Sequence, residues 1–343
     1  MSHQEQIQEA FAKGAPLSIQ GGGSKSFLGS PSSREQVLRT TNMNGILDYQ
    51  PEELFIRARA GTPLQDIEEL LYQEQQILPF EPPHFSPAAT LGGTIASGLS
   101  GPSRPWRGAA RDFVLGCMLI NGKGERLHFG GEVIKNVAGY DVSRLQCGAF
   151  GTLGLLEELS IKTLPAPEHE LTLELEMNEA GALQNLMVWN RQPLPLSGAA
   201  WHRGILRIRL SGTAAAVAEG HRHIGGEPSG NNGFWEQLKE QRLDFFDAHK
   251  PLWRISLPRG SGVLELPGDT LLDWGGAQRW LLSDSTFDTL SEIARNAGGH
   301  VRPYHPHQPI PLNHGLMLLH QRLKEAFDPA GILNPGQLFP QSR

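Results

Sequence analysis

The sequence predicts an α+β protein of two domains, in which antiparallel sheets carry helices on one face. Three observations predict this class. The length of 343 residues fits about two domains of 100–200 residues each. Hydrophobic residues make up 39% of the chain and charged residues 19%, which is enough for packed cores. Short runs of alternating polarity are interleaved with segments of helical spacing.

The first half of the chain predicts strands and one long helix around glycine-rich loops. A short strand covers residues 17–20, and residues 45–49 and 54–58 form a strand pair. A helix follows, with Thr62 as its N-cap and Pro63 in its first position. The 40 glycines, about 12% against a usual value of about 7%, also favour many turns and close backbone approaches.

The following segments predict a hairpin, a long strand and then a second domain. Residues 113–120 and 125–129 form a β-hairpin around Asn121-Gly122, and residues 152–165 a long strand. From about residue 168, strands alternate with helices. The expected strands are 171–177, 204–212, 253–258, 263–268 and 279–282, and the expected helices are 179–189, 213–224, 288–298 and 316–327.

Composition excludes several classes of protein. The net charge is −6 and no basic run occurs, so nucleic acid is not an expected partner. The N-terminus is polar, and the strongly apolar stretch 113–120 is interrupted by Gly116, so neither a signal peptide nor a transmembrane segment is expected. Cys117 and Cys147 give neither an iron–sulfur spacing nor a disulfide framework, which favours a reducing compartment.

The first loop that carries chemistry is Gly21-Gly22-Gly23-Ser24-Lys25-Ser26, directly after a short strand. Three consecutive glycines let backbone N–H groups converge on an anion, and Ser24, Ser26 and Lys25 add donors and a positive charge. A diphosphate fits this chemistry, and a flexible turn is the alternative. The loop matches neither a P-loop nor a strand–GxGxxG–helix, which disfavours nucleotide sites of those two kinds.

Two further loops share this character. Residues 87–98 place Gly92-Gly93 at the head of a short helix, whose free N–H groups could hold a phosphate or ring oxygen. Tight helix packing is the alternative explanation. Residues 135–141 lead into a short helix for which Asp141 is the expected N-cap, and residues 147–154 again expose backbone polar groups beside a strand.

Together, the three loops resemble the FAD-binding fold of the p-cresol methylhydroxylase (PCMH) and vanillyl-alcohol oxidase type. The resemblance covers about residues 1–168 and implies two α+β subdomains that hold an extended FAD between them. Ser24 stands where covalent relatives place a histidine, which implies a non-covalent flavin. The cofactor-binding residues that the resemblance implies are Gly21, Gly22, Gly23, Ser24, Lys25, Ser26, Pro87, Thr90, Leu91, Gly92, Gly93, Ala96, Ser97, Gly98, Gly151, Gly154, Leu155 and Asn334.

The C-terminal segment 323–336 resembles the ending shared by D-lactate dehydrogenases and glycolate oxidase flavoprotein subunits, which folds back toward the flavin ring. Over its whole length the chain is similar to the shorter, FAD-binding E subunits of bacterial glycolate oxidases (glycolate dehydrogenases). The resemblance implies an FAD-binding domain over 1–168, a smaller antiparallel α+β cap domain over 169–300, and a C-terminal segment over 301–343.

The same resemblance implies the function. The chain would be the FAD-binding subunit of a complex that oxidises glycolate, a small 2-hydroxy acid, to glyoxylate and passes electrons to an iron–sulfur subunit. Its expected partners are that subunit and a larger FAD-containing subunit. The expected location is the cytoplasm, with peripheral docking on the inner face of the cytoplasmic membrane as an open alternative.

Catalytic residues are less well marked than the cofactor loops. Arg302, His305 and His307 are the candidates, because a hydroxy acid needs an Arg to bind its carboxylate and a His to accept its hydroxyl proton. An incidental polar loop is the alternative. The metal motif of larger relatives is absent, those relatives usually carry Glu where Phe150 stands, and no metal is expected.

The rival functions are a self-sufficient FAD-dependent D-2-hydroxy acid dehydrogenase, a flavin-free structural subunit of the complex, and a UDP-sugar reductase of the same fold. The glycine loops count against the second rival, and the tail counts against the third.

Overall fold

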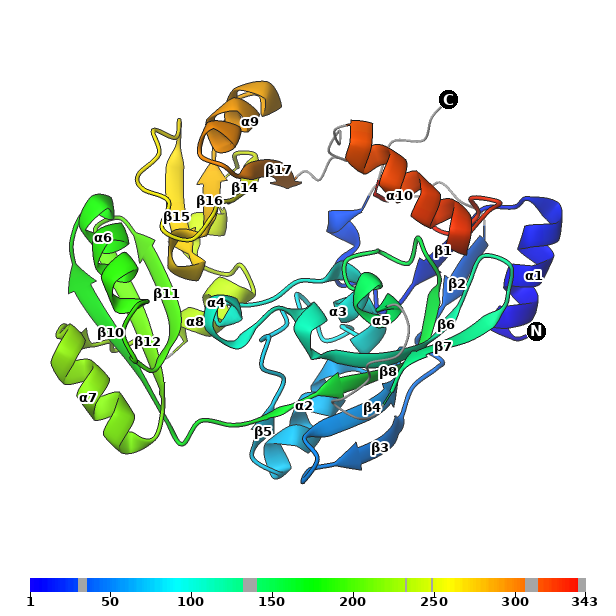
Figure 1. Cartoon of the computed structure of the whole chain (residues 1–343), viewed down its shortest axis with the longest axis horizontal. Helices are drawn as coiled ribbons and strands as arrows, with labels where there is room; N and C mark the ends of the chain where they lie inside the picture. Colours follow the sequence, from blue (N-terminus) through cyan, green and yellow to red (C-terminus); the bar gives the residue numbers. More distant parts are fainter. Residues whose placement is uncertain (30–35, 132–140, 232, 248, 306–313, 339–343) are drawn as a thin grey trace. The chain divides into compact units, whose positions relative to one another are not determined.

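A computed structural model describes residues 1–29, 36–131, 141–231, 233–247, 249–305 and 314–338. The chain folds into two compact units, and the expected α+β class is confirmed (Figure 1). Unit 1 contains Met1–Leu99, Ala109–Pro165 and Pro309–Arg343, and unit 2 contains Ser100–Gly108 and Ala166–Gln308. The chain therefore enters unit 2 twice.

Unit 1 is built on a five-stranded antiparallel sheet of order β3-β4-β8-β6-β7. The strands are β3 (Ile46–Gln50), β4 (Phe55–Arg59), β6 (Val114–Ile120), β7 (Arg126–Gly130) and β8 (Leu155–Lys162). The predicted strand pair, hairpin and long strand are all present. Apolar residues of β4, β6 and β8 share one core with helices α2 (Leu64–Gln73) and α3 (Leu91–Ser97).

The expected start of helix α2 is wrong by one position. Pro63 is the N-cap and makes no side-chain capping bond. The Thr62 hydroxyl instead accepts a hydrogen bond from Gly45 N at 3.0 Å and donates one to Gly45 O at 3.2 Å. A tertiary contact with the start of β3 thus takes the side chain that local capping preferences assign to the helix.

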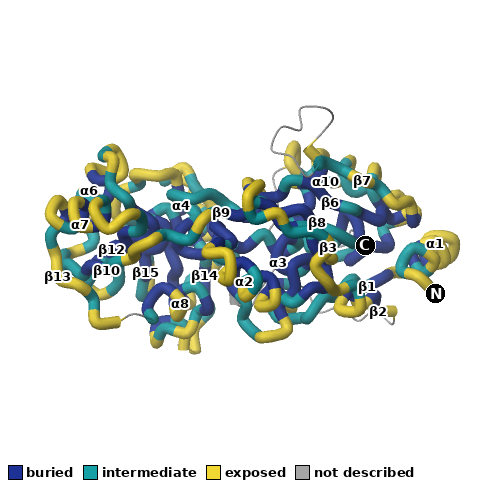
Figure 2. The backbone as a smooth tube through the Cα atoms, turned by 90° about the horizontal axis from the view of Figure 1, so that it is seen from below, coloured by how far each residue is buried: buried dark blue, intermediate teal, exposed yellow. Residues whose placement is uncertain are grey.

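The N- and C-terminal segments form a second core of unit 1. Helix α1 (His3–Lys13) packs its buried Ile7 and Ala10 with Leu17 and Leu333, whereas its outer face is exposed (Figure 2). Strands β1 (Leu17–Gln20) and β2 (Gln36–Arg39) pair in parallel. The other elements of unit 1 are α5 (Val142–Leu145), α10 (His314–Phe327), β5 (Gln76–Ile77) and β9 (Leu164–Pro165).

Unit 2 contains an eight-stranded antiparallel sheet of order β13-β10-β12-β11-β15-β16-β14-β17. The strands are β10 (His169–Glu176), β11 (Leu196–His202), β12 (Ile205–Gly212), β13 (Glu227–Pro228), β14 (Leu252–Ser256), β15 (Asp269–Asp273), β16 (Gln278–Leu282) and β17 (His300–His305). The helices are α4 (Arg104–Arg107), α6 (Glu179–Trp189), α7 (Ala214–Ile224), α8 (Phe234–Lys239) and α9 (Phe287–Asn296). Residues of α6 and α7 pack on β10–β12, and those of α9 pack on β14, β16 and β17.

One expected strand of unit 2 is wrong. Residues 263–268 are irregular, and the strand begins at Asp269. Leu264 and Leu266 still pack against the core, so their alternating polarity reflects burial alone. The fully buried Arg279 donates to Ser261 O at 3.3 Å and to Gly262 O at 2.5 Å just before this segment, so a side chain satisfies carbonyls that a neighbouring strand would otherwise bind.

The two cysteines, Cys117 and Cys147, are free thiols. Burial raises the pKa of Cys117 to about 11 and that of Cys147 to about 12. Because only the thiolate reacts, a thiol reagent at pH 8 should label the folded chain at least about a hundredfold more slowly than the unfolded chain. Labelling rates with and without denaturant test this, and equal rates would contradict the burial of both thiols.

Candidate functional site

The glycine-rich loops of unit 1 surround a cavity of about 360 Å³. Strand β1, the loop after it, helix α3, the loop before β8 and the C-terminal segment all contribute to its wall. Most predicted cofactor-binding residues line this cavity, and they come from all three loops and the tail. They are Gly21, Gly22, Gly23, Ser24, Lys25, Ser26, Thr90, Gly92, Gly93, Ala96, Ser97, Gly151, Gly154 and Asn334.

Four residues of the predicted set do not line the cavity. Leu91 and Leu155 are completely buried in the two cores of unit 1. Gly98 ends helix α3 in the left-handed conformation, and its N–H donates to Thr94 O and Ile95 O. Pro87 is exposed. These positions shape the loops without forming the wall of the cavity.

The loop after β1 approaches its neighbours so closely that side chains are excluded. A Cβ atom on Gly22 would lie 1.5 Å from Ala88 O, and one on Gly21 would lie 2.6 Å from Thr90 Oγ1. Gly23 adopts a φ of 74°, which also favours glycine. Within the described residues, the N–H groups of Gly22, Gly23 and Ser24 donate no hydrogen bond to the protein. The loop therefore leaves amide donors available to an anion.

Lys25 is the charged residue among the described residues that line the cavity. Its ammonium group lies 3.4 Å from Ser24 Oγ and 3.5 Å from His84 O, and 5.9 Å from the ring centre of Phe85. His84 is itself held by Glu68 at 2.8 Å. The cation is thus positioned beside the free amides, where a diphosphate would bring its negative charge.

Helix α3 serves the site differently from the expectation. The sequence predicts free N–H groups at its start, but the N–H groups of Leu91, Gly92 and Gly93 all donate within the protein. Their acceptors are Thr62 O at 3.0 Å, Ala60 O at 2.7 Å and Thr90 Oγ1 at 3.2 Å. The prediction of free N–H groups at this helix start is therefore wrong. The contribution of helix α3 is a wall of small residues, where Gly92 lets the helix lie against Ala60.

The third loop is tied to helix α3 and to the C-terminal segment. The N–H groups of Gly148 and Phe150 donate to Ile95 O at 3.0 Å and Ala96 O at 2.9 Å, so they are not the free polar groups that the sequence predicts. Asn334 closes the same wall of the cavity. Its Oδ1 accepts from Ile19 N at 2.7 Å, and its Nδ2 donates to Phe150 O at 2.7 Å.

Replacing Asn334 by Ala should weaken both folding and cofactor binding. The substitution leaves the part-buried Ile19 N and Phe150 O without their partner, which costs about 2 kcal/mol. We expect a lower melting temperature and a lower flavin content after purification. Asn44→Ala, at an exposed position of the same unit, is the matched control. Wild-type stability of Asn334→Ala would show that these bonds do not hold the tail.

Several cavity residues are absent from the sequence-based set, and Gln20, Thr40, Ala60, Phe150 and Gln337 are examples. They lie on short strands or in turns, and their own residue types carry no signature of a cofactor site. Phe150 carries one local signal, because its position directly before Gly151 and its φ of 50° mark a tight turn. The others reach the cavity only through tertiary folding.

The catalytic candidates belong to another part of the fold. Arg302 lies on β17 in unit 2, opposite Arg254 of β14. The backbone of His305 ends the same strand, and His307 lies outside the described residues. Among the residues described, no group of three His, Cys, Asp or Glu side chains could hold a metal ion. The described helices also include none with the length and apolar character needed to span a bilayer.

Comparison with known proteins places this chain in a family. Residues 2–130 match the family described as "FAD binding domain". The chain is 47% identical to "Glycolate oxidase subunit GlcE" of Escherichia coli (strain K12), over 98% of this chain and 96% of that protein. The chain belongs to the GlcE family. FAD is therefore the cofactor of its FAD binding domain.

More distant relatives share only part of this GlcE-family chain. "Glycolate oxidase subunit GlcD" of Bacillus subtilis is 31% identical over 46% of this chain and 34% of that protein. "D-lactate dehydrogenase" of Anaerostipes hadrus is 32% identical over 40% of this chain and 28% of that protein. A solved structure of alkyldihydroxyacetonephosphate synthase aligns with a TM-score of 0.68 at 16% identity, covering 97% of this chain and 74% of that one, which shows a shared fold.

The cavity fits the cofactor of this family. Its loop after β1 has no space for a Cβ atom at Gly22, and it presents free amide donors and one cation. That donor set matches a diphosphate, while the small residues of α3 and the apolar Ile19, Val37 and Leu156 suit flat ring systems.

Proposed function

We propose that this chain is the FAD-binding subunit of a glycolate oxidase complex, with FAD held non-covalently in the cavity of unit 1. The observation that carries the proposal is the convergence of the Gly21–Ser26 loop, helix α3 and Asn334 on one cavity in a chain of the GlcE family. Its proposed partners are a larger flavoprotein subunit and an iron–sulfur subunit. Its proposed location is the cytoplasm, with docking at the membrane through the complex.

Residues of both units contribute to this function. The amides of Gly22, Gly23 and Ser24, with Lys25, bind the diphosphate, and the glycines of α3 let the rest of the cofactor lie close to the backbone. When bound, FAD supplies a flavin ring that accepts a hydride from C2 of the hydroxy acid. Arg302 is the candidate for holding the carboxylate, and His305 and His307 are the candidates for taking the hydroxyl proton.

A comparison of the isolated chain with the assembled complex tests this function. We expect the isolated chain to carry FAD and to turn over neither glycolate nor D-lactate with an artificial dye as acceptor, and the complex to oxidise glycolate. Turnover by the isolated chain would instead establish the self-sufficient dehydrogenase. A complex that stays active when this chain carries no flavin would establish the structural subunit.

A further inference from the structure

Unit 2 concentrates arginines on one face of its sheet. Arg254 of β14 pairs directly with Arg302 of β17 on one side and with Trp280 of β16 on the other. Residues directly opposite one another in an antiparallel sheet project to the same face, so the two guanidinium groups are cross-strand neighbours. Like charges in this arrangement destabilise a sheet, which requires an explanation.

Two tryptophans and a third arginine surround Arg254. Its guanidinium carbon lies 5.0 Å from the ring centre of Trp274 and 5.9 Å from that of Trp280, and Arg104 lies 4.4 Å from the ring centre of Trp274. Both tryptophans are buried. The rings stabilise the cations and hold them in place.

Two buried donors of this cluster lack an acceptor among the described residues. The Nε of Arg254 and the Nε1 of Trp280 are buried and have no hydrogen-bond partner among the described residues. The nearby carboxylate of Asp273 accepts from Trp274 N at 2.7 Å and from Gln278 Nε2 at 2.9 Å. Unsatisfied buried donors are costly, and an acceptor that carries negative charge would satisfy them.

Two further arginines, Arg302 and Arg104, bring positive charge close to Arg254. Burial, together with the charges of Arg302 and Arg104, lowers the pKa of Arg254 to about 10, although Tyr304 and Asp273 act in the opposite direction. Burial and the charges of Arg254 and Arg302 also lower the pKa of His300, which favours its neutral form at pH 7. Arg254 itself stays protonated at that pH.

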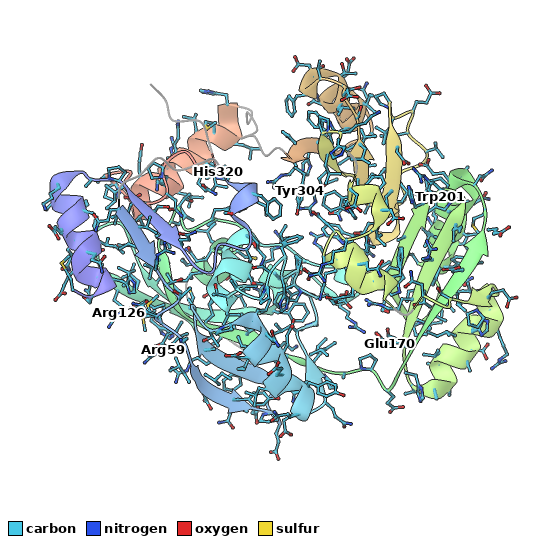
Figure 3. The ribbon with its side chains drawn as sticks, turned by 180° about the vertical axis from the view of Figure 1, so that it is seen from behind. Arg59, Arg126, Glu170, Trp201, Tyr304 and His320 are labelled. Carbon is cyan, nitrogen blue, oxygen red and sulfur yellow. The ribbon has the colours of Figure 1, made fainter. Side chains whose placement is uncertain are left out.

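We infer that Arg254, together with Arg302 and Trp280, forms a carboxylate-binding site in unit 2 for the small 2-hydroxy acid. The inference rests on the proposed function, which supplies the monocarboxylate, whereas the fold supplies the donors. A planar guanidinium group binds a carboxylate through two parallel N–H donors. Arg302 is one of the candidates from the sequence, and the sheet register places Arg254 opposite it. Tyr304, which lies on the same strand as Arg302, is labelled in Figure 3.

Calorimetric titration of the full chain carrying its flavin tests the site. The probes are sodium glycolate, ethylene glycol, which has the hydroxyl but no carboxylate, and sodium chloride at matched ionic strength. The wild-type chain should bind glycolate and neither of the other two. Arg254→Gln should weaken glycolate binding about tenfold to a hundredfold, as expected for loss of a charged hydrogen-bonding partner. The glycolate affinity of Arg254→Lys should lie between those of the wild type and Arg254→Gln.

Arg222→Gln is the control, because Arg222 is an exposed arginine of helix α7, and it should bind glycolate like the wild type. Melting temperatures without ligand add a second readout, since Arg254→Gln removes a like-charge pair together with two ring contacts and should leave the melting temperature close to that of the wild type. If Arg254→Gln fails to fold, Arg302→Gln tests the same cluster and should weaken glycolate binding by a similar factor.

Several results would overturn the inference. They are glycolate binding by Arg254→Gln within twofold of the wild type, absence of glycolate binding by a wild-type chain that carries flavin, and equal binding of chloride, which would indicate a general anion site. Flavin absorption by the same chain tests the proposed function separately. A colourless chain that still binds glycolate through Arg254 would refute that function and leave the carboxylate site standing.

Discussion

Gly22→Ala should lose FAD. A Cβ atom at this position would lie 1.5 Å from Ala88 O, which is a backbone atom, so one of the two loops has to move. Moving the loop separates the amides of Gly23 and Ser24 from their common target. Steric costs of this kind are about 1–3 kcal/mol, which corresponds to a loss of FAD affinity of about tenfold to a hundredfold.

Flavin content of the purified variant, followed by titration with added FAD, measures this loss. Gly230→Ala is the matched control, because a Cβ atom there meets nothing within 4 Å and its backbone does not require glycine. We expect Gly230→Ala to keep the wild-type flavin content. If Gly22→Ala kept it as well, the assignment of the Gly21–Ser26 loop to the diphosphate would be wrong.

Asp328→Ala should be the most destabilising single substitution in the C-terminal segment. Asp328 is buried, and it accepts hydrogen bonds from Ile332 N at 3.1 Å, Leu333 N at 2.7 Å and Lys324 Nζ at 2.5 Å. The same ammonium group donates to Thr152 O and Leu333 O, both at 2.7 Å. Removing the carboxylate leaves a part-buried cation and two backbone donors, which costs about 3 kcal/mol.

Urea denaturation of three variants separates this buried ion pair from a surface pair. Glu9→Ala breaks the Lys13–Glu9 pair, which has the same i,i+4 spacing in unit 1 but is exposed, and should change stability by no more than about 0.5 kcal/mol. Asp328→Asn keeps an acceptor and should lie between the two. Asp328 accepts hydrogen bonds from Ile332 N and Leu333 N, directly before Asn334 in the cavity wall. Asp328→Ala should therefore also lose flavin. Equal effects of Asp328→Ala and Glu9→Ala would contradict the role of the buried network.

The glycine-rich loops that line the cavity were predictable from the sequence because their signature is local. Three consecutive glycines after a strand have few structural uses, and the structure places Gly21–Ser26 on the cavity. Strand pairs with short turns were predictable for the same reason, as β6 and β7 around Asn121-Gly122 show.

Features that depend on tertiary partners were not predictable from the sequence. The start of α3 has the composition of an anion site, but Ala60 O and Thr62 O, both in the turn after β4, take its donors. Likewise, the alternation of residues 263–268 indicates a strand, although the carbonyls just before it bind Arg279. The pairing of Arg254 with Arg302 follows from a strand register across 48 residues of chain, for which the sequence carries no signal.

The visible absorption spectrum of the purified full chain, followed by acid precipitation, tests the central claim most directly. We predict the absorption of an oxidised flavin, which moves to the supernatant when the protein is precipitated, because FAD is held without a covalent bond. A colourless chain that also takes up no added FAD would contradict the assignment of the unit 1 cavity. Flavin that stays with the precipitate would contradict non-covalent binding.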